Sequence, residues 1–272
     1  MKVSNKNIFL SSVFMCSTLV AYAVNAETHL MTENPHYGEK GWEVEAGVGI
    51  GKVSNWVYKT NEDNKGFVML NLNARYYGEN LYFVADDEEG LLLGYNASKS
   101  EKTAIDVVLA PRFAGWHDDN ELLNGMNKRD IDLHAGIRYT QYLDDSLYKI
   151  EVSNDISGAH SGSIFSATYE KEWQQKNWII TGLVSAIYVS EKMADYYFGV
   201  SSSEATAEYP VHKVDANLLL GLGAKAEYPI NENWVFKAAV SHLISDGEVS
   251  DSPITLDENN ISTVSATMTY HF

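Results

Sequence analysis

Three histidines, His134, His160 and His242, are the candidates for a serine-dependent hydrolase. Such an enzyme needs a serine nucleophile, a histidine base and an orienting carboxylate within hydrogen-bond reach. His160, in the segment 157–162, is the most suggestive of the three. The sequence contains no Gly-x-Ser-x-Gly elbow and no His-Glu-x-x-His helix. We therefore interpret His160 as a loop or rim side chain bonded to a carboxylate, and we predict a protein without catalytic residues.

The same residue types do not indicate a metal centre or a cofactor. The histidines are scattered and lack metal-ligand spacing, and the single cysteine is Cys16. Acidic clusters at 86–89, 118–119 and 144–145 are typical of solvated turns. Acidic residues in the segment 245–260 favour divalent cations shared with lipopolysaccharide phosphates, because hard cations prefer oxygen ligands. We predict no cofactor and no dedicated metal site.

The first 26 residues have the pattern of a secretory signal peptide. Lys2 and Lys6 precede a mostly apolar run at 8–20, and small residues follow before the expected cleavage between Ala26 and Glu27. Cleavage would take the formal net charge from −17 to −19, because the segment holds two lysines and no acid. So acidic a chain is not expected to bind nucleic acid or to anchor through basic residues.

The final segment, 264–272, shows the pattern that organises the whole chain. Every second residue, from Val264 to Tyr270 and Phe272, is apolar, while serine, threonine and histidine lie between them. Side chains of a strand alternate between its two faces, so this segment has one apolar and one polar face. An alternating last strand with a terminal aromatic is typical of outer-membrane barrels, and Tyr270 and Phe272 are the predicted signal for the barrel-assembly machinery.

Similar alternation recurs along the chain. Strands of 10–13 residues, tilted by about 45°, suffice to span a membrane, and no apolar run is long enough for a helical span. We predict an all-β, transmembrane, antiparallel up-and-down β-barrel at 42–272, with twelve strands as the best count and ten to fourteen as the range. Residues 27–41 would form a periplasmic N-terminal segment. The predicted strands are 42–53, 67–77, 81–85, 91–96, 104–116, 130–142, 147–156, 162–173, 178–189, 214–228, 234–244 and 261–272.

The links and the charges are consistent with this topology. Links that would be periplasmic are short, whereas several external links are long, as at 190–213 and 245–260. Tryptophan and tyrosine gather at strand ends, where lipid headgroups begin. The predicted lumen face mixes both signs of charge, which favours a ladder of ion pairs over an open selective channel. Its charged residues are Glu43, Glu45, Arg75, Asp132, Arg138, Lys149, Glu151, Lys225 and Lys237.

Several short stretches, together with the closing strand, resemble the MipA/OmpV family of outer-membrane proteins, named partly for an MltA-interacting protein. The chain departs from the usual family pattern at 201–212, which lacks a Gly-Leu-Pro segment. The matching stretches are 83–87 (Phe-Val-Ala-Asp-Asp), 91–95 (Leu-Leu-Leu-Gly-Tyr), 155–162 (Asp-Ile-Ser-Gly-Ala-His-Ser-Gly), 197–200 (Tyr-Phe-Gly-Val) and 251–254 (Asp-Ser-Pro-Ile).

The resemblance implies a barrel in the outer membrane of a Gram-negative bacterium, in contact with lipid and lipopolysaccharide. It implies a scaffold that joins a periplasmic lytic transglycosylase to a murein synthase, or an envelope or surface protein. The family shares no defined catalytic mechanism. A narrow diffusion pore for small solutes is the alternative, because twelve strands lie between filled and open barrels.

Two of the family stretches fall in the long external links, away from the periplasm. We expect these links to fold back and plug the lumen with Tyr196, Tyr197 and Phe198, since three consecutive aromatics are costly in water. A periplasmic partner would then contact the segment 27–41, which includes His29, His36 and Tyr37.

Overall fold

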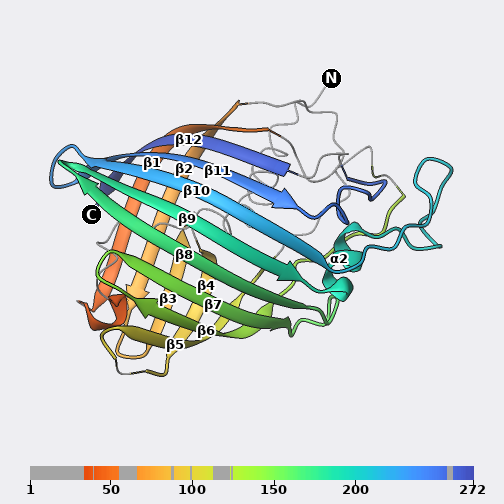
Figure 1. Cartoon of the computed structure of the whole chain (residues 1–272), viewed down its shortest axis with the longest axis horizontal. Helices are drawn as coiled ribbons and strands as arrows, with labels where there is room; N and C mark the ends of the chain where they lie inside the picture. The colour runs from red at the N-terminus through yellow and green to blue at the C-terminus, as the bar shows by residue number, and fades with distance from the viewer. Residues whose placement is uncertain are drawn as a thin grey trace, which may run out of the picture.

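The chain folds into a closed antiparallel β-barrel in the computed structural model, which describes residues 34–38, 40–54, 66–86, 89–98, 100–112, 123, 125–255 and 260–272. Twelve strands within these residues pair in sequence order, and β1 closes the ring against β12. The predicted fold class and strand number are therefore confirmed. Figure 1 shows the strands wrapped around one lumen, with the helix α2 at one end and the C-terminus at the other.

The strands are long and tilted in the second half of the barrel and shorter near β3, β4 and β5. A 3₁₀ turn precedes the barrel, and α2 lies between β9 and β10. The elements are η1 (Pro35–Tyr37), β1 (Gly41–Val53), β2 (Gly66–Tyr77), β3 (Leu81–Asp86), β4 (Gly90–Asn96), β5 (Thr103–Ala110), β6 (His134–Tyr142), β7 (Ser146–Asp155), β8 (Ser163–Gln175), β9 (Trp178–Val189), α2 (Glu191–Phe198), β10 (Asn217–Pro229), β11 (Trp234–Ser245) and β12 (Asn260–His271).

Alternation along each strand separates an outer apolar face from an inner face. On β2, Leu70 is 79% exposed, whereas the neighbouring Asn71 and Asn73 are buried. Such outward apolar residues have no protein partner, which is the condition of side chains that face lipid. The described part of the chain has no helix long and apolar enough to span a membrane.

Aromatic rings gather at the end of the barrel where the short turns lie. Trp178 contacts Tyr228 with ring centroids 5.0 Å apart, and Trp234 contacts Tyr270 at 5.2 Å. Tyr270 also contacts the terminal Phe272 at 5.0 Å. Amphipathic rings prefer the headgroup region, and short turns face the periplasm in such barrels. We therefore assign this end to the periplasm and the end that carries α2 to the exterior.

Close approach between β1 and β12 requires glycine on the inner face of β1. Gly49 pairs with Thr267 across the closure. A Cβ atom at position 49 would lie 2.3 Å from the Thr267 Cγ2 atom and 2.6 Å from the Ala266 carbonyl oxygen. Glycine therefore allows the two strands that close the ring to pack tightly.

Three predicted strand boundaries were wrong on the external side. β6 begins at His134 instead of 130, because Asp132 and Leu133 bond to neighbouring loops instead of a ladder. β10 begins at Asn217 instead of 214, because Val214 is buried in a loop cluster. β5 ends at Ala110, directly before Pro111. Proline cannot donate to a ladder, so the extension of this strand to 116 was an error within its described part.

The N-terminal predictions lie mostly outside the described residues. The proposed signal peptide at 1–26, its cleavage between Ala26 and Glu27, and residues 27–33 all fall there. The barrel begins at Gly41, one residue before the predicted boundary.

Candidate functional site in the lumen and at its external mouth

Ion pairs cross the middle of the lumen on the side of β5 to β8. Arg138 of β6 contacts Glu89 at 2.7 Å and Glu151 of β7 at 2.9 Å. Glu89 also accepts a hydrogen bond from the Lys149 ammonium at 2.7 Å, and Arg112 contacts Glu151. These side chains are mostly buried, so charge-assisted bonds replace much of their hydration.

A second group of pairs lies on the other side of the ring. Lys237 of β11 contacts Glu45 of β1 at 2.7 Å, and Lys225 contacts Glu227 at 3.0 Å. The lumen charges therefore occur as pairs of opposite sign, as the sequence predicted. A wall of mutually paired charges is a rigid lining with little net charge.

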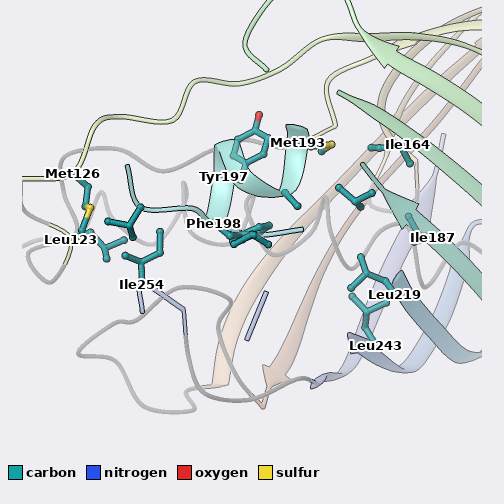
Figure 2. Packing of buried hydrophobic residues seen from close by; sticks show 14 of the residues in the cluster. Leu123, Met126, Ile164, Ile187, Met193, Tyr197, Phe198, Leu219, Leu243 and Ile254 are labelled. Atoms are coloured by element: carbon teal, nitrogen blue, oxygen red, sulfur yellow. The ribbon is translucent and has the colours of Figure 1, made fainter. Parts of the chain in front are cut away.

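The external mouth holds an apolar cluster instead. Met193, Ala194, Tyr197 and Phe198 of α2 are buried, and Tyr197 is only 1% exposed. Figure 2 shows α2 beside Ile164, Ile187, Leu219 and Leu243, which project inward from β8, β9, β10 and β11. The last residue of β9 and residues of the external links complete this mouth cluster. They are Val189 of β9, Val200, Tyr209 and Val214 of the link that carries α2, Leu123 and Met126 of the link before β6, and Ile254 of the link before β12.

Glu204 joins two of the external links at the mouth. Its carboxylate accepts bonds from the Arg129 guanidinium at 2.8 Å, the Asn127 amide at 2.9 Å and the Ser201 amide at 3.0 Å. Burial alone would raise the pKa of Glu204, but these donors outweigh it and lower the pKa to about 2. The carboxylate therefore stays ionised and holds the links together at neutral pH.

The predicted plug residues lie in this region but differ in burial. Tyr197 and Phe198 are within the mouth cluster, whereas Tyr196 is partly buried at its edge. The Tyr197 hydroxyl donates to the Asp130 carbonyl at 3.0 Å, and the Tyr196 hydroxyl accepts from the Asp130 amide at 3.0 Å. The Ser252 hydroxyl donates to the Phe198 carbonyl at 2.5 Å. The aromatic helix is therefore bonded to the links on both sides of it.

The sequence carried a signal for the mouth cluster that the pattern analysis missed. Ile164, Ile187, Leu219 and Leu243 are apolar residues at inward positions, where the alternation rule places polar ones. All four lie near the external ends of their strands. Apolar residues on the lumen side at one end of several strands indicate that an apolar segment packs into that mouth.

The segment before β1 lies against the periplasmic end of the lumen wall. Asn34 donates to the Ser100 and Thr103 carbonyls, and the His36 ring lies 4.6 Å from the Tyr82 ring. Burial, reinforced by the positive charges of Lys40 and Arg138, lowers the pKa of His36 to about 4. The His36 side chain is therefore packed against the barrel, and binding of a partner to the segment 27–41 stays a prediction.

Tyr37, in contrast, remains available at the surface. It is 48% exposed. The part of the segment 27–41 that the structure describes thus has one exposed tyrosine side chain.

His134 and His160 meet at a shared carboxylate. Asp132 Oδ2 lies 3.0 Å from His160 Nε2 and 3.3 Å from His134 Nε2, and His134 Nδ1 lies 3.2 Å from Ser153 Oγ. The interpretation of His160 as a rim side chain bonded to a carboxylate is confirmed. His242 lies apart on β11 and bonds to Ser262.

The order Ser153–His134–Asp132 has the connectivity of a catalytic triad, but its serine is inaccessible. Ser153, His134 and Asp132 are each fully buried. A nucleophile needs room for a substrate carbonyl beside it, and none of these side chains has a solvent-facing atom to offer. The triad geometry therefore does not by itself indicate a hydrolase.

The C-terminal residues proposed as the assembly signal end the barrel at the periplasmic side. The Phe272 amide donates to the Val44 carbonyl at 3.1 Å, and the Phe272 side chain is exposed. Tyr270 and Phe272 therefore present an aromatic pair outside the closure of β1 with β12. Their role in assembly stays a prediction.

Residues 46–272 match the family model of the MltA-interacting protein MipA. The chain belongs to this family. The match covers nearly the whole barrel and confirms the resemblance that the short motifs indicated.

Two curated relatives share almost the full length of the chain. Outer membrane protein OmpV of Vibrio cholerae is 26% identical over 96% of this chain and 98% of its own length. Outer membrane protein Omp26La of Vibrio anguillarum is 25% identical over the same shares. The MltA-interacting protein of Escherichia coli K12 is 21% identical over 83% of this chain and 89% of its own.

Among solved structures, an outer membrane channel from Pseudomonas putida F1 aligns with 92% of this chain and 100% of its own. The TM-score is 0.42 and the identity 9%, a similarity too low to bear on function. The family match, the names of the relatives and the closed barrel together define the protein as a MipA/OmpV-type β-barrel of the outer membrane.

Proposed function

We propose that this barrel is plugged and acts as a non-enzymatic scaffold or surface protein of the cell envelope. The observation that supports the proposal is side-chain packing at two levels of the lumen. The mouth cluster occupies the external end, and the ion pairs around Arg138 and Glu151 cross the middle. Packing of this kind would hinder the passage of solutes through the lumen. The function would then lie in the surfaces that face the periplasm or the exterior.

The partners proposed for the scaffold are a periplasmic lytic transglycosylase and a murein synthase. Support comes from the relative in Escherichia coli that is named MltA-interacting protein. On this chain, the surfaces facing the periplasm are the short turns and the exposed Tyr37. A docking partner would engage these, because the segment around His36 is occupied by barrel contacts.

A narrow diffusion pore is the second candidate, favoured by a strip of small inward residues. Gly47 pairs with Thr269, and Gly49 with Thr267, at the closure of the ring. Neither glycine nor threonine extends far into the lumen, so this strip is where a solute path would run.

Planar-bilayer conductance of the refolded mature chain separates these functions. A plugged barrel is silent when intact. Current after removal of residues 195–201 would identify the mouth cluster as the barrier, and silence after the deletion would place the barrier at the ion pairs around Arg138 and Glu151. That deletion takes out Tyr196, Tyr197 and Phe198, which belong to the helix or border the cluster. Steady conductance of the intact chain would instead favour the pore.

The scaffold needs its own test, because a silent barrel need not bind anything. The refolded chain, immobilised through an external loop, should retain a purified lytic transglycosylase, and a Tyr37→Ala variant should retain less. Equal capture by the barrel and by an unrelated outer-membrane barrel would contradict the scaffold while leaving the plug intact.

A further inference from the structure

Three side chains, two from external links and one from the first residue of β6, converge near α2. Asp132 precedes β6, His134 is the first residue of β6, and His160 lies in the link between β7 and β8. Their potential ligand atoms all lie within 4.8 Å of one another. The side chains of Asp132, His134 and His160 are completely buried. We propose that they form a binding site for a borderline divalent transition-metal ion of the zinc class.

The donor set fits such an ion. Two imidazoles and one carboxylate are a common set for zinc and its neighbours, with open positions left for water. Zinc–nitrogen bonds of about 2.0–2.1 Å place neighbouring tetrahedral ligands about 3.3 Å apart. The two separations from Asp132 Oδ2, 3.0 Å to His160 Nε2 and 3.3 Å to His134 Nε2, are close to that edge length. Small side-chain movements would therefore complete the geometry.

His134 supplies a second observation that points to a ligand. Its Nε2 atom is buried and makes no hydrogen bond within the described part of the chain, although it lies 3.3 Å from Asp132 Oδ2. The pair is within ion-pair distance but lacks hydrogen-bond geometry. An unsatisfied buried ring nitrogen costs free energy, and a metal ion at this point would satisfy it.

The surrounding bonds hold the donors in the required orientation. The Arg112 amide donates to Asp132 Oδ1 at 2.7 Å, which turns Oδ2 toward the histidines. His134 Nδ1 lies 3.2 Å from the Ser153 hydroxyl, so its proton has an acceptor while Nε2 binds a metal. Outer contacts of this kind fix the tautomer of a ligating histidine.

His160 must change tautomer when it binds the ion. Its Nδ1 accepts from the Gly162 amide at 2.8 Å, so Nε2 carries the proton and donates to Asp132. Coordination through Nε2 moves that proton to Nδ1, so the Gly162 amide must turn away and Nδ1 must approach Asp155 Oδ2, which lies 3.9 Å from it.

The site has a mechanical consequence for the plug. The His160 ring lies 5.7 Å from Tyr196 and 5.6 Å from Tyr197, and both tyrosines bond to Asp130. An ion held by Asp132 and His160 therefore ties together the two links on which α2 rests. Metal binding is expected to stiffen the mouth cluster.

The test is binding of Zn²⁺ to the untagged mature chain, refolded with and without the ion because the site is buried. Isothermal titration and Co²⁺ absorption should report one tight equivalent, and the loaded chain should resist proteolysis in the link 157–161 for longer. His160→Gln and His134→Gln should each weaken binding by at least about 100-fold, since loss of one outer contact alone costs about 10–100-fold.

Two further variants keep the test independent of folding. His242→Gln removes a histidine that bonds Ser262 on β11, and it should bind Zn²⁺ like the parent chain. Asp132→Asn keeps an acceptor for the Arg112 amide but should lose the ion, with unchanged heat-modifiable migration as the folding check. Absence of tight binding in the parent chain would overturn the proposal. Binding of Zn²⁺ by His160→Gln and His134→Gln as tight as by the parent chain would overturn it too.

Discussion

The external mouth and the middle of the lumen are occupied by opposite chemistry. At the mouth, apolar side chains of α2 and three external links pack on inward residues of β8, β9, β10 and β11. In the middle, arginine and lysine side chains of the strands pair with carboxylates; Glu151 and Glu45 lie on strands, and Glu89 lies in the link between β3 and β4. The two regions lie along one lumen, so the difference follows from where the residues come from in the chain.

Strand residues must obey alternation, since each inward position has outward neighbours that face lipid. The inner wall is polar as a consequence, and polar groups fill it best by pairing. External links have no such constraint and can supply apolar residues in any order. An apolar mouth is therefore contributed mainly by links, whereas a charged middle is contributed mainly by strands.

The largest expected effect is on the mouth. Tyr197→Ala removes a fully buried ring together with its bond to Asp130, and it should lower the free energy of unfolding by about 3–5 kcal/mol. Thermal denaturation in detergent measures this. Val211→Ala in the same external link is the control, because Val211 is 62% exposed and should change little. Equal melting of both variants would mean that the cluster contributes no packing energy.

A smaller loss is expected in the middle. Arg138→Met leaves Glu89 and Glu151 without one partner each, at a cost of about 2 kcal/mol, since bonds to charged groups contribute about 1.5–3 kcal/mol. Lys171→Met is the matched control, because its partner Asp145 lies at the surface. If Arg138→Met melts like the control, the ion pairs of Arg138 contribute no measurable free energy of unfolding. The middle of the lumen would then not stabilise the barrel as the mouth does.

The smallest effect is a local response to pH, and it separates the two ends of the barrel. His36 has a pKa of about 4 when docked and 6.5 when free, so docking is fully favourable above about 6.5 and weakens as the pH falls to 4. Glu204 has a pKa of about 2 in the folded chain and 4.5 when free. Its contribution to stability is therefore complete above about 4.5 and declines as the pH falls from 4.5 towards 2. Hydrogen exchange, corrected for the intrinsic rate at each pH, should therefore show less protection at 34–38 at pH 5 than at pH 7, while protection at 199–204 is retained.

His36→Asn is the control for this response, because an amide does not titrate. It should remove the change between pH 7 and 5 at 34–38 and leave 199–204 unaltered. Loss of protection in both segments together in the parent chain would show that the barrel opens as one unit. The two ends would then not respond to pH independently.

The strand pattern allowed most of the barrel to be predicted, while its external borders required the folded chain. Alternation located all twelve strands and placed Arg138 and Glu151 on the lumen face, where the structure pairs them. The pattern at 130–133 also alternates, yet Asp132 leaves the ladder to bond with His160. Local periodicity does not reveal that the strand begins only at His134, because the group that bonds Asp132 lies in another link.

The candidate metal site shows the same limit. His134 and His160 are far apart in sequence, and no spacing rule joins them. They meet because antiparallel pairing of β6 with β7 places His134 opposite Asp155, directly before the link that carries His160. Registry between strands creates the site, so a scan for ligand spacing along the chain overlooked it.

The sequence by itself determined a barrel with a lipid-facing exterior and a polar, charge-paired interior, because side-chain alternation is a local property of each strand. The tertiary structure decided what occupies the mouth and which histidines share a carboxylate. These features depend on contacts such as that between Tyr197 and Asp130, which are 67 residues apart and meet only after the strands have closed into a ring.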